Sequence, residues 1–185
     1  VWVVATIALL YTHYWGVFIV GGELVALAFL GPGRASVYSQ HCFAVYPLAT
    51  QAVGAQHIVV RSKHYGHDLD AMRAAIRDDT RLVFVANPNN PTGTFLSGQE
   101  IELFIERIPS HVVVVIDEAY NEFLTPEQQY DAIEWVRRFP NVIVSRSFSK
   151  AYGLAGLRIG YGIAQPLITD LLNRIRQPFN VNSLA

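Results

Sequence analysis

Three short polar motifs each follow a run of aliphatic residues, and together they hold the most reactive side chains of this 185-residue sequence. Asn87 opens an Asn/Pro/Thr/Gly stretch, Asp117 opens Asp-Glu-Ala-Tyr, and Ser147 opens Ser-Phe-Ser-Lys, which ends at Lys150. A lysine amine can condense with an aldehyde, a buried carboxylate can pair with a cation, and hydroxyls can bind phosphate oxygens. Each motif alone is also typical of turns and helix caps, so the functional interpretation depends on all three occurring together.

The aliphatic runs and the segments between them predict alternating strands and helices. Strands are expected at 36–39, 57–60, 82–86, 112–116 and 142–145. Helices are expected at 23–30, 43–53, 68–79, 97–108 and 126–139, with a last one beginning near Pro166. Such uninterrupted aliphatic strands indicate an α/β fold of three layers, with helices on both faces of a mainly parallel sheet. In sheets of this kind ligands bind beyond the carboxyl ends of the strands, where the three motifs lie.

The combined motifs match the requirements of a pyridoxal cofactor. Such a cofactor needs a lysine amine for its aldehyde, a carboxylate for its ring nitrogen, donors for its ring hydroxyl oxygen, and hydroxyls plus an arginine for its phosphate. Lys150 offers the amine, and Asp117 leaves a buried strand where a carboxylate needs a cationic partner. Ser147, Ser149 and Arg158 lie close enough along the chain to converge on one dianion.

Longer stretches of the sequence carry a resemblance to a known family. They read FAVYPLATQAVGA, NPNNPTGT, VIDEAYNEF, SFSKAYGLAGLRIGYG and RQPFNVN. From about residue 23 to the end, the chain resembles the fold-type I pyridoxal-phosphate-dependent aminotransferases, and among them the histidinol-phosphate aminotransferase branch. The resemblance implies the large domain of a fold-type I transferase, with pyridoxal 5'-phosphate as its cofactor.

The resemblance also implies a role for each site residue, position by position. Lys150 would bond the cofactor aldehyde and act as general acid and base, and Asp117 would pair with the ring nitrogen. Asn90 and Tyr120 would bind the ring hydroxyl oxygen, and Phe43 would stack on the ring. The residues that would hold the phosphate are Ser147, Ser149 and Arg158. Within this set the implied catalytic residues are Lys150, Asp117 and Tyr120, and Tyr46 is expected to pack nearby.

The implied reaction converts histidinol phosphate and 2-oxoglutarate into imidazole-acetol phosphate and glutamate, a step of histidine biosynthesis. Its partners are a small-molecule amino donor and a 2-oxoacid, and the resemblance implies a homodimer. Two alternatives within the class stay open, a related aromatic aminotransferase and a threonine-phosphate decarboxylase. A truncated, catalytically inactive remnant and a ligand-sensing domain of a regulator are further alternatives, although no basic helix-turn-helix precedes the domain.

The beginning of the chain departs from the family. Residues 1–20 form an apolar segment without a formally charged residue and match nothing in the family. We interpret residues 21–185 as a partial cofactor-binding large domain that lacks the family's small C-terminal domain and N-terminal arm. The family's phosphate loop, Gly-x-Gly-Ser-x-Glu, would fall at 16–23, which reads GVFIVGGE. The apolar segment is long enough to span a bilayer, but without flanking Lys or Arg either a buried element or a sequence altered at its beginning is favoured.

Composition narrows the remaining classes of partner. Fourteen Lys and Arg nearly balance fifteen Asp and Glu without a basic run, so neither nucleic acid nor an anionic membrane is an expected partner. The single cysteine, Cys42, cannot form an internal disulfide, and we expect a cytoplasmic protein. No metal site is expected, because no pair among His41, His57, His64 and His67 has metalloprotease spacing. No general base is placed for Ser149, which argues against a serine hydrolase.

Overall fold

The computed structural model describes residues 25–176, together with 178, 180, 181, 183 and 184. The apolar segment 1–20 and the stretch 16–23, where the family's phosphate loop was expected, lie outside the described residues. In the part of the chain that is described, every helix is too short or too polar to cross a membrane.

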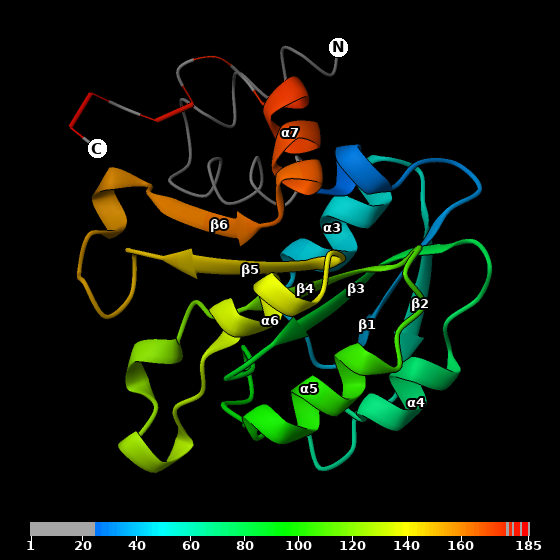
Figure 1. Cartoon of the computed structure of the whole chain (residues 1–185), viewed down its shortest axis with the longest axis horizontal. Coiled ribbons are helices and arrows are strands. Elements are labelled where there is room, and N and C mark those ends of the chain that lie inside the picture. The colour runs from blue at the N-terminus through cyan, green and yellow to red at the C-terminus, as the bar shows by residue number, and fades with distance from the viewer. Residues whose placement is uncertain (1–24, 177, 179, 182, 185) are drawn as a thin grey trace.

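A single sheet of six strands runs through the described part of the chain in the order β2-β1-β3-β4-β5-β6 (Figure 1). The strands are β1 (Ala35–Ser39), β2 (Gln56–Val60), β3 (Thr80–Ala86), β4 (Val113–Asp117), β5 (Val142–Ser147) and β6 (Gly160–Ala164). Every neighbouring pair from β2 to β5 is parallel, whereas β6 pairs with β5 in the antiparallel sense. The predicted α/β fold with a mainly parallel sheet is therefore confirmed.

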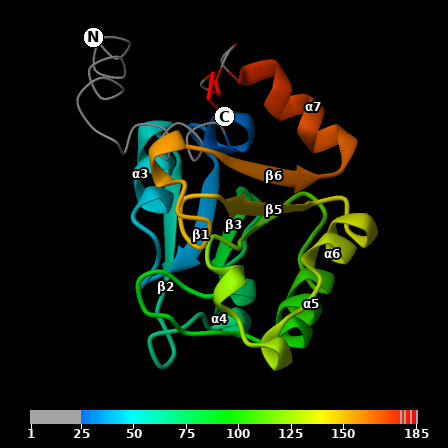
Figure 2. The ribbon, with the colours of Figure 1, turned by 90° about the vertical axis from the view of Figure 1, so that its left-hand side faces the viewer.

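Helices cover both faces of this sheet (Figure 2). Their bounds are α3 (Val45–Ala52), α4 (Leu69–Ala74), α5 (Gly98–Glu106), α6 (Ala132–Arg138) and α7 (Pro166–Ile175). Neighbouring residues of β1 point to opposite faces of the sheet and belong to different hydrophobic clusters. Val37 packs in a cluster with residues of α4, α5 and α6. Tyr38 packs in a second cluster with residues of α3, α7 and the helical stretch 25–29. This alternation follows from the strand period of two and gives the three layers that the sequence predicts.

Cap residues fix where several helices begin. Asp68 accepts a hydrogen bond from the backbone N of Ala71 at 3.0 Å, as its place before α4 predicts. Ser97 and Glu100 form a reciprocal capping box at the start of α5. Pro166 is the first residue of α7, where its missing N–H would in any case find no partner within the helix.

The expected helices at 126–139 and 68–79 differ most from the structure, and one strand was not expected. The helix predicted at 126–139 is divided into a 3₁₀ turn, η2 (Pro126–Gln128), and α6, because Asp131 is extended and caps a new helix at Ile133 N. The helix predicted at 68–79 ends at Ala74. Strand β6, with the sequence GYGIA, lacks the aliphatic run by which the other strands were found.

Candidate functional site

A cavity of about 530 Å³ opens at the carboxyl ends of β3, β4 and β5. All eight residues predicted for the site lie in its wall, namely Phe43, Asn90, Asp117, Tyr120, Ser147, Ser149, Lys150 and Arg158. They come from segments more than 100 residues apart in the sequence, so the fold gathers at one sheet edge what the sequence analysis placed there.

Parallel register places the polar motifs side by side. Asp117, the last residue of β4, lies opposite Ala86 on β3 and Ser145 on β5. The Asn/Pro loop follows Ala86 directly, and Ser147 ends β5 three residues before Lys150. Because these strands stop at the same edge, Asn90, Asp117 and Lys150 line one cavity.

Asp117 is the half-buried acid of the site. Its Oδ2 accepts a hydrogen bond from the Tyr46 hydroxyl at 2.7 Å, and its Oδ1 accepts one from the backbone N of Ala119 at 3.1 Å. Burial raises the pKa of this carboxyl, while the bonds from Tyr46, Ala119 and Ser145 and the nearby charge of Lys150 act to lower that pKa. The arrangement is suited to hold a cationic or protonated group beside Asp117.

Lys150, Tyr120 and Asn90 form the second part of the wall. The Lys150 ammonium nitrogen lies 5.3 Å from the centre of the Tyr120 ring, within the range of a cation–π contact. The Asn90 amide nitrogen lies 3.5 Å from the Tyr120 hydroxyl. An amine, a phenol and an amide donor thus face the same space, and Lys150 is exposed enough to be reached by a ligand.

Hydroxyls and a guanidinium make up the third part of the cavity wall. The backbone N of Ser149 donates to the Ser147 Oγ at 3.1 Å, which turns the chain after β5. The Ser149 Oγ is buried and makes no hydrogen bond to the described residues. Arg158 stands in the left-handed backbone region, and its guanidinium donates to the Ala155 carbonyl at 2.6 Å. This group of donors is suited to an oxyanion such as a phosphate.

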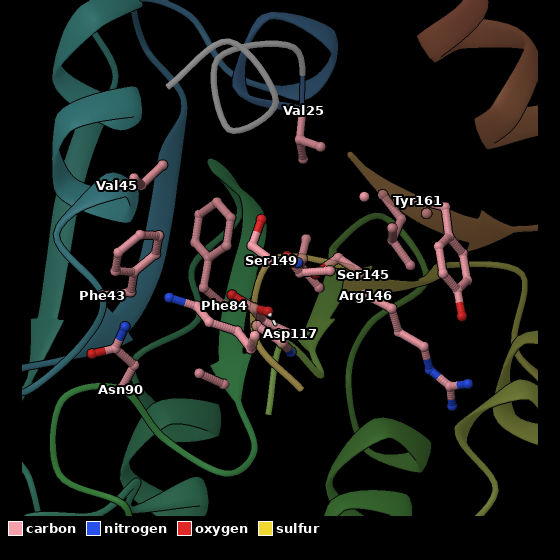
Figure 3. A pocket seen from close by; sticks show the side chains of 18 of the residues that line it. Val25, Phe43, Val45, Phe84, Asn90, Asp117, Ser145, Arg146, Ser149 and Tyr161 are labelled. Carbon is pink, nitrogen blue, oxygen red and sulfur yellow. Dashed lines mark hydrogen bonds between the residues drawn. The ribbon is translucent and has the colours of Figure 1, made fainter. Parts of the chain in front are cut away.

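Aromatic rings form the apolar side of the cavity (Figure 3). Tyr46 stacks on Phe84 with ring centroids 4.6 Å apart and planes 8° apart. Phe43 meets Tyr46 edge to face at 5.9 Å. Tyr46 was expected to pack nearby, which it does, but its hydrogen bond to Asp117 was not predicted. Its place three residues after Phe43 is only a weak indication of a role in the site, because the fold alone decides how the helix that holds Tyr46 lies against β4.

The histidines and the cysteine lie elsewhere. Among the described residues no group of three or more His, Cys, Asp or Glu side chains is arranged to hold a metal ion. His67 is buried and its Nε2 bonds the Ala86 carbonyl at 2.9 Å, beneath the cavity rather than in its wall. Burial raises the pKa of Cys42 to about 11, so this thiol is not activated.

Comparison with curated proteins finds histidinol-phosphate aminotransferases among the relatives of this chain. Histidinol-phosphate aminotransferase 2 of Ralstonia nicotianae is 68% identical over 163 residues, which make up 88% of this chain and 44% of the relative. The chain spans less than half the length of the curated relatives it matches.

Solved structures agree with this comparison. The histidinol-phosphate aminotransferase of Sinorhizobium meliloti, crystallised with pyridoxal-5'-phosphate, superposes with a TM-score of 0.79 at 32% identity, covering 84% of this chain and 42% of that one. The L-threonine-O-3-phosphate decarboxylase of Porphyromonas gingivalis gives 0.78 at 26% identity, covering 90% and 48%. The described sheet and its helices thus have the fold of these enzymes' cofactor-binding domain. The family model for aminotransferase class I and II matches residues 20–185, and the chain therefore belongs to the aminotransferase class I and II family.

Proposed function

We propose that this chain binds pyridoxal 5'-phosphate in the cavity and contributes to transamination between histidinol phosphate and 2-oxoglutarate, which yields imidazole-acetol phosphate and glutamate. The observation that carries the cofactor part is the convergence of Lys150, Asp117 and the buried hydroxyl of Ser149 on one cavity. The substrate part is supported by the 68% identity to a histidinol-phosphate aminotransferase. Because the chain spans less than half of such relatives, the activity is proposed for the protein to which this domain belongs.

The residues of the cavity fit the cofactor group by group. A phosphate would accept a hydrogen bond from the Ser149 Oγ, which makes none to the described residues, and would be neutralised by Arg158. The ring nitrogen would donate to Asp117, whose burial makes a cationic neighbour favourable. Phe43 would cover one face of the ring, and Asn90 and Tyr120, already within 3.5 Å of each other, would bind its hydroxyl oxygen.

The chain's own residues account for the proton transfers. When bound, pyridoxal phosphate supplies an electron-withdrawing ring that stabilises negative charge at the substrate α-carbon. Asp117 keeps a proton on the ring nitrogen, because a buried carboxylate is most stable beside a positive charge. The Lys150 Nζ takes the proton from the α-carbon and returns one, since it is the amine in reach of that region. The Tyr120 ring beside Lys150 helps to hold the ammonium in place.

Three further expectations belong to this proposal. Residues 21–185 are proposed to be part of a cofactor-binding large domain, as the family match over 20–185 supports. A homodimer is proposed for the protein that contains this domain. A cytoplasmic location also stays a prediction, based on a chain with one cysteine.

A trapping experiment tests the cofactor site. Purified protein is mixed with pyridoxal phosphate, its absorption spectrum is recorded, and the bound cofactor is fixed with borohydride before peptide mapping. The chain contains two lysines, Lys63 and Lys150, so Lys63→Ala is a matched control for Lys150→Ala. We expect the label on Lys150, retained in Lys63→Ala and lost in Lys150→Ala. Label divided between both lysines, or unchanged in Lys150→Ala, would refute the assignment.

A second measurement separates the reaction from cofactor binding. Histidinol phosphate, an aromatic amino acid and phosphothreonine are each supplied as amine, with 2-oxoglutarate as acceptor, and glutamate and released CO₂ are measured. Glutamate from histidinol phosphate supports the proposed reaction, whereas CO₂ from phosphothreonine would support the decarboxylase. Trapping on Lys150 without any turnover would support the interpretation as a cofactor-binding part of the enzyme that is inactive by itself.

A further inference from the structure

Tyr46 contacts the acid of the proposed cofactor site from a different layer of the fold. It lies on α3, 71 residues before Asp117, and its hydroxyl donates to the Asp117 Oδ2 at 2.7 Å. Nothing in the family motifs used above gives this residue a role beyond packing.

The position of the Tyr46 hydroxyl is fixed by its surroundings. The side chain is 5% exposed, and its ring is stacked on Phe84 and met edge-on by Phe43. Rotating the ring away from Asp117 would break both aromatic contacts, each of which is favourable beyond the area it buries. The hydroxyl is therefore preorganised to point at the carboxylate of Asp117.

The hydrogen bonds to Asp117 leave room for one more donor. An ionised carboxylate offers about four lone-pair positions. The Tyr46 hydroxyl donates to Oδ2 and the backbone N of Ala119 donates to Oδ1 of the Asp117 carboxylate. Because each oxygen is held by one donor, the carboxylate has a fixed orientation and keeps lone pairs for a further N–H from the cavity that it lines.

We propose that Tyr46 is a positioning residue that orients the Asp117 carboxylate, so that it can hold the protonated ring nitrogen of pyridoxal phosphate. This inference rests on the proposed function and adds a residue to that site. It predicts that the hydroxyl of Tyr46, rather than its ring, affects cofactor binding.

The acid–base properties of the pair agree with this role. Burial, followed by the charge of Asp117 and the hydrogen bond to it, raises the pKa of Tyr46 well above its usual value, so the hydroxyl stays a donor. Burial also raises the pKa of Asp117, and among the groups that counteract it the hydrogen bond from Tyr46 comes first, ahead of Ala119, Ser145 and the charge of Lys150. Loss of the Tyr46 hydroxyl should therefore favour protonation of Asp117.

Two tyrosine-to-phenylalanine variants test the inference. Tyr46→Phe removes one hydroxyl and keeps the stacked ring. Tyr38→Phe is the matched control, because Tyr38 is 2% exposed in the same apolar cluster and its hydroxyl bonds His57, outside the cavity wall. Each variant keeps its ring and loses one part-buried side-chain hydrogen bond, so both should show thermal destabilisation of the same order.

The first readout uses protein without cofactor. Aspartate side chains are labelled with ¹³C at the carboxyl carbon, Asp117 is assigned with Asp117→Asn, and its titration is followed by NMR. We expect the pKa of Asp117 to rise in Tyr46→Phe and to stay unchanged in Tyr38→Phe. An unchanged titration in Tyr46→Phe would overturn the inference whether or not the chain binds the cofactor.

The second readout is the affinity for pyridoxal phosphate, measured by absorption or fluorescence titration. Losing a hydrogen bond to a charged group should weaken binding about tenfold in Tyr46→Phe. In an Asp117→Asn background the same change should have less than about a twofold effect, because the charge it supports is gone. Equal weakening in both backgrounds, or in Tyr38→Phe, would overturn the role. A raised pKa of Asp117 without cofactor trapping on Lys150 would instead refute the proposed function and leave the Tyr46 contact established.

Discussion

Removing either partner of the ion pair between Glu118 and Arg146 is predicted to destabilise the fold by unequal amounts. The Arg146 Nε lies 2.8 Å from the Glu118 Oε2, and the two side chains are 19% and 0% exposed. Glu118 directly follows Asp117, but Arg146 points away from Asp117 (Figure 3). The pair therefore ties the ends of β4 and β5 together beside the cavity, whose wall includes Arg146.

The expected magnitudes follow from what each substitution leaves behind. Arg146→Met leaves the fully buried carboxylate of Glu118 without its guanidinium, a change that costs about 3 to 5 kcal/mol in buried pairs. Glu118→Gln leaves a guanidinium that already reaches solvent, and the new amide oxygen can still accept its hydrogen bond. That substitution should cost about 1 to 2 kcal/mol.

The two variants should also differ in pH dependence. Burial raises the pKa of Glu118, and Arg146 is the main group that lowers it again, so Arg146→Met should raise this pKa further. A carboxyl with a raised folded-state pKa penalises the folded state increasingly as pH rises above its ordinary value of 4.5. The deficit of Arg146→Met should therefore grow with pH, whereas that of Glu118→Gln should shrink, because the wild type also bears the raised pKa of Glu118 and the variant does not.

Urea unfolding at a series of pH values, extrapolated linearly to water, measures both effects. The Arg146→Met, Glu118→Gln double variant is the control, since it removes the buried charge together with its partner. It should be more stable than Arg146→Met alone at neutral pH. A loss in Glu118→Gln as large as that in Arg146→Met, or a pH-independent deficit in Arg146→Met, would refute the reasoning.

Three further predictions concern stability. Gly160→Ala should cost about 1 to 3 kcal/mol by overpacking, because its Cβ would stand 2.7 Å from a carbonyl oxygen of β5. Gly162→Ala, whose nearest such contact is 3.9 Å, should cost far less in the same urea assay. Ser97→Ala should lower stability by about 1 kcal/mol through loss of the capping box, measurable as a shifted urea midpoint. His67 is buried with a pKa lowered by burial, so the wild type should lose stability as pH falls below 6.5, and His67→Gln should melt with a weaker dependence on acid.

Most of the sheet could be predicted because its strands are buried on both faces. The runs ending at Ala86 and Asp117 are almost purely aliphatic, and this composition is what a strand between two helical layers requires. Polar residues follow these runs where the strands end. Because the strands are parallel neighbours, these residues could be predicted to lie near one another at the same edge of the sheet. Topology thus accounts for the grouping of the polar residues, whereas Phe43, Asn90 and Tyr120 were assigned by the family resemblance; all eight predicted residues lie in the wall of one cavity.

The features that were missed depend on tertiary contacts. Strand β6 is an exposed antiparallel edge, so it needs no aliphatic run, and its Gly160 fits only because of the carbonyl it faces. The division of the helix at 126–139 depends on an extended Asp131, a conformation that the helical pattern around it does not disclose. Tyr46 has a partner 71 residues away, and no local spacing could connect it to Asp117.

Cofactor chemistry and substrate choice have different physical bases in this chain. The groups proposed to hold pyridoxal phosphate are fixed by the ends of adjacent parallel strands, which the aminotransferase and the decarboxylase structures share with nearly equal TM-scores. Geometry at the strand ends therefore supports the cofactor but is compatible with either reaction. The reaction is indicated by sequence identity instead, and 68% is well above the 26% shared with the decarboxylase. Trapping on Lys150 consequently tests the geometric part of the proposal, and the comparison of histidinol phosphate with phosphothreonine tests the part that rests on sequence.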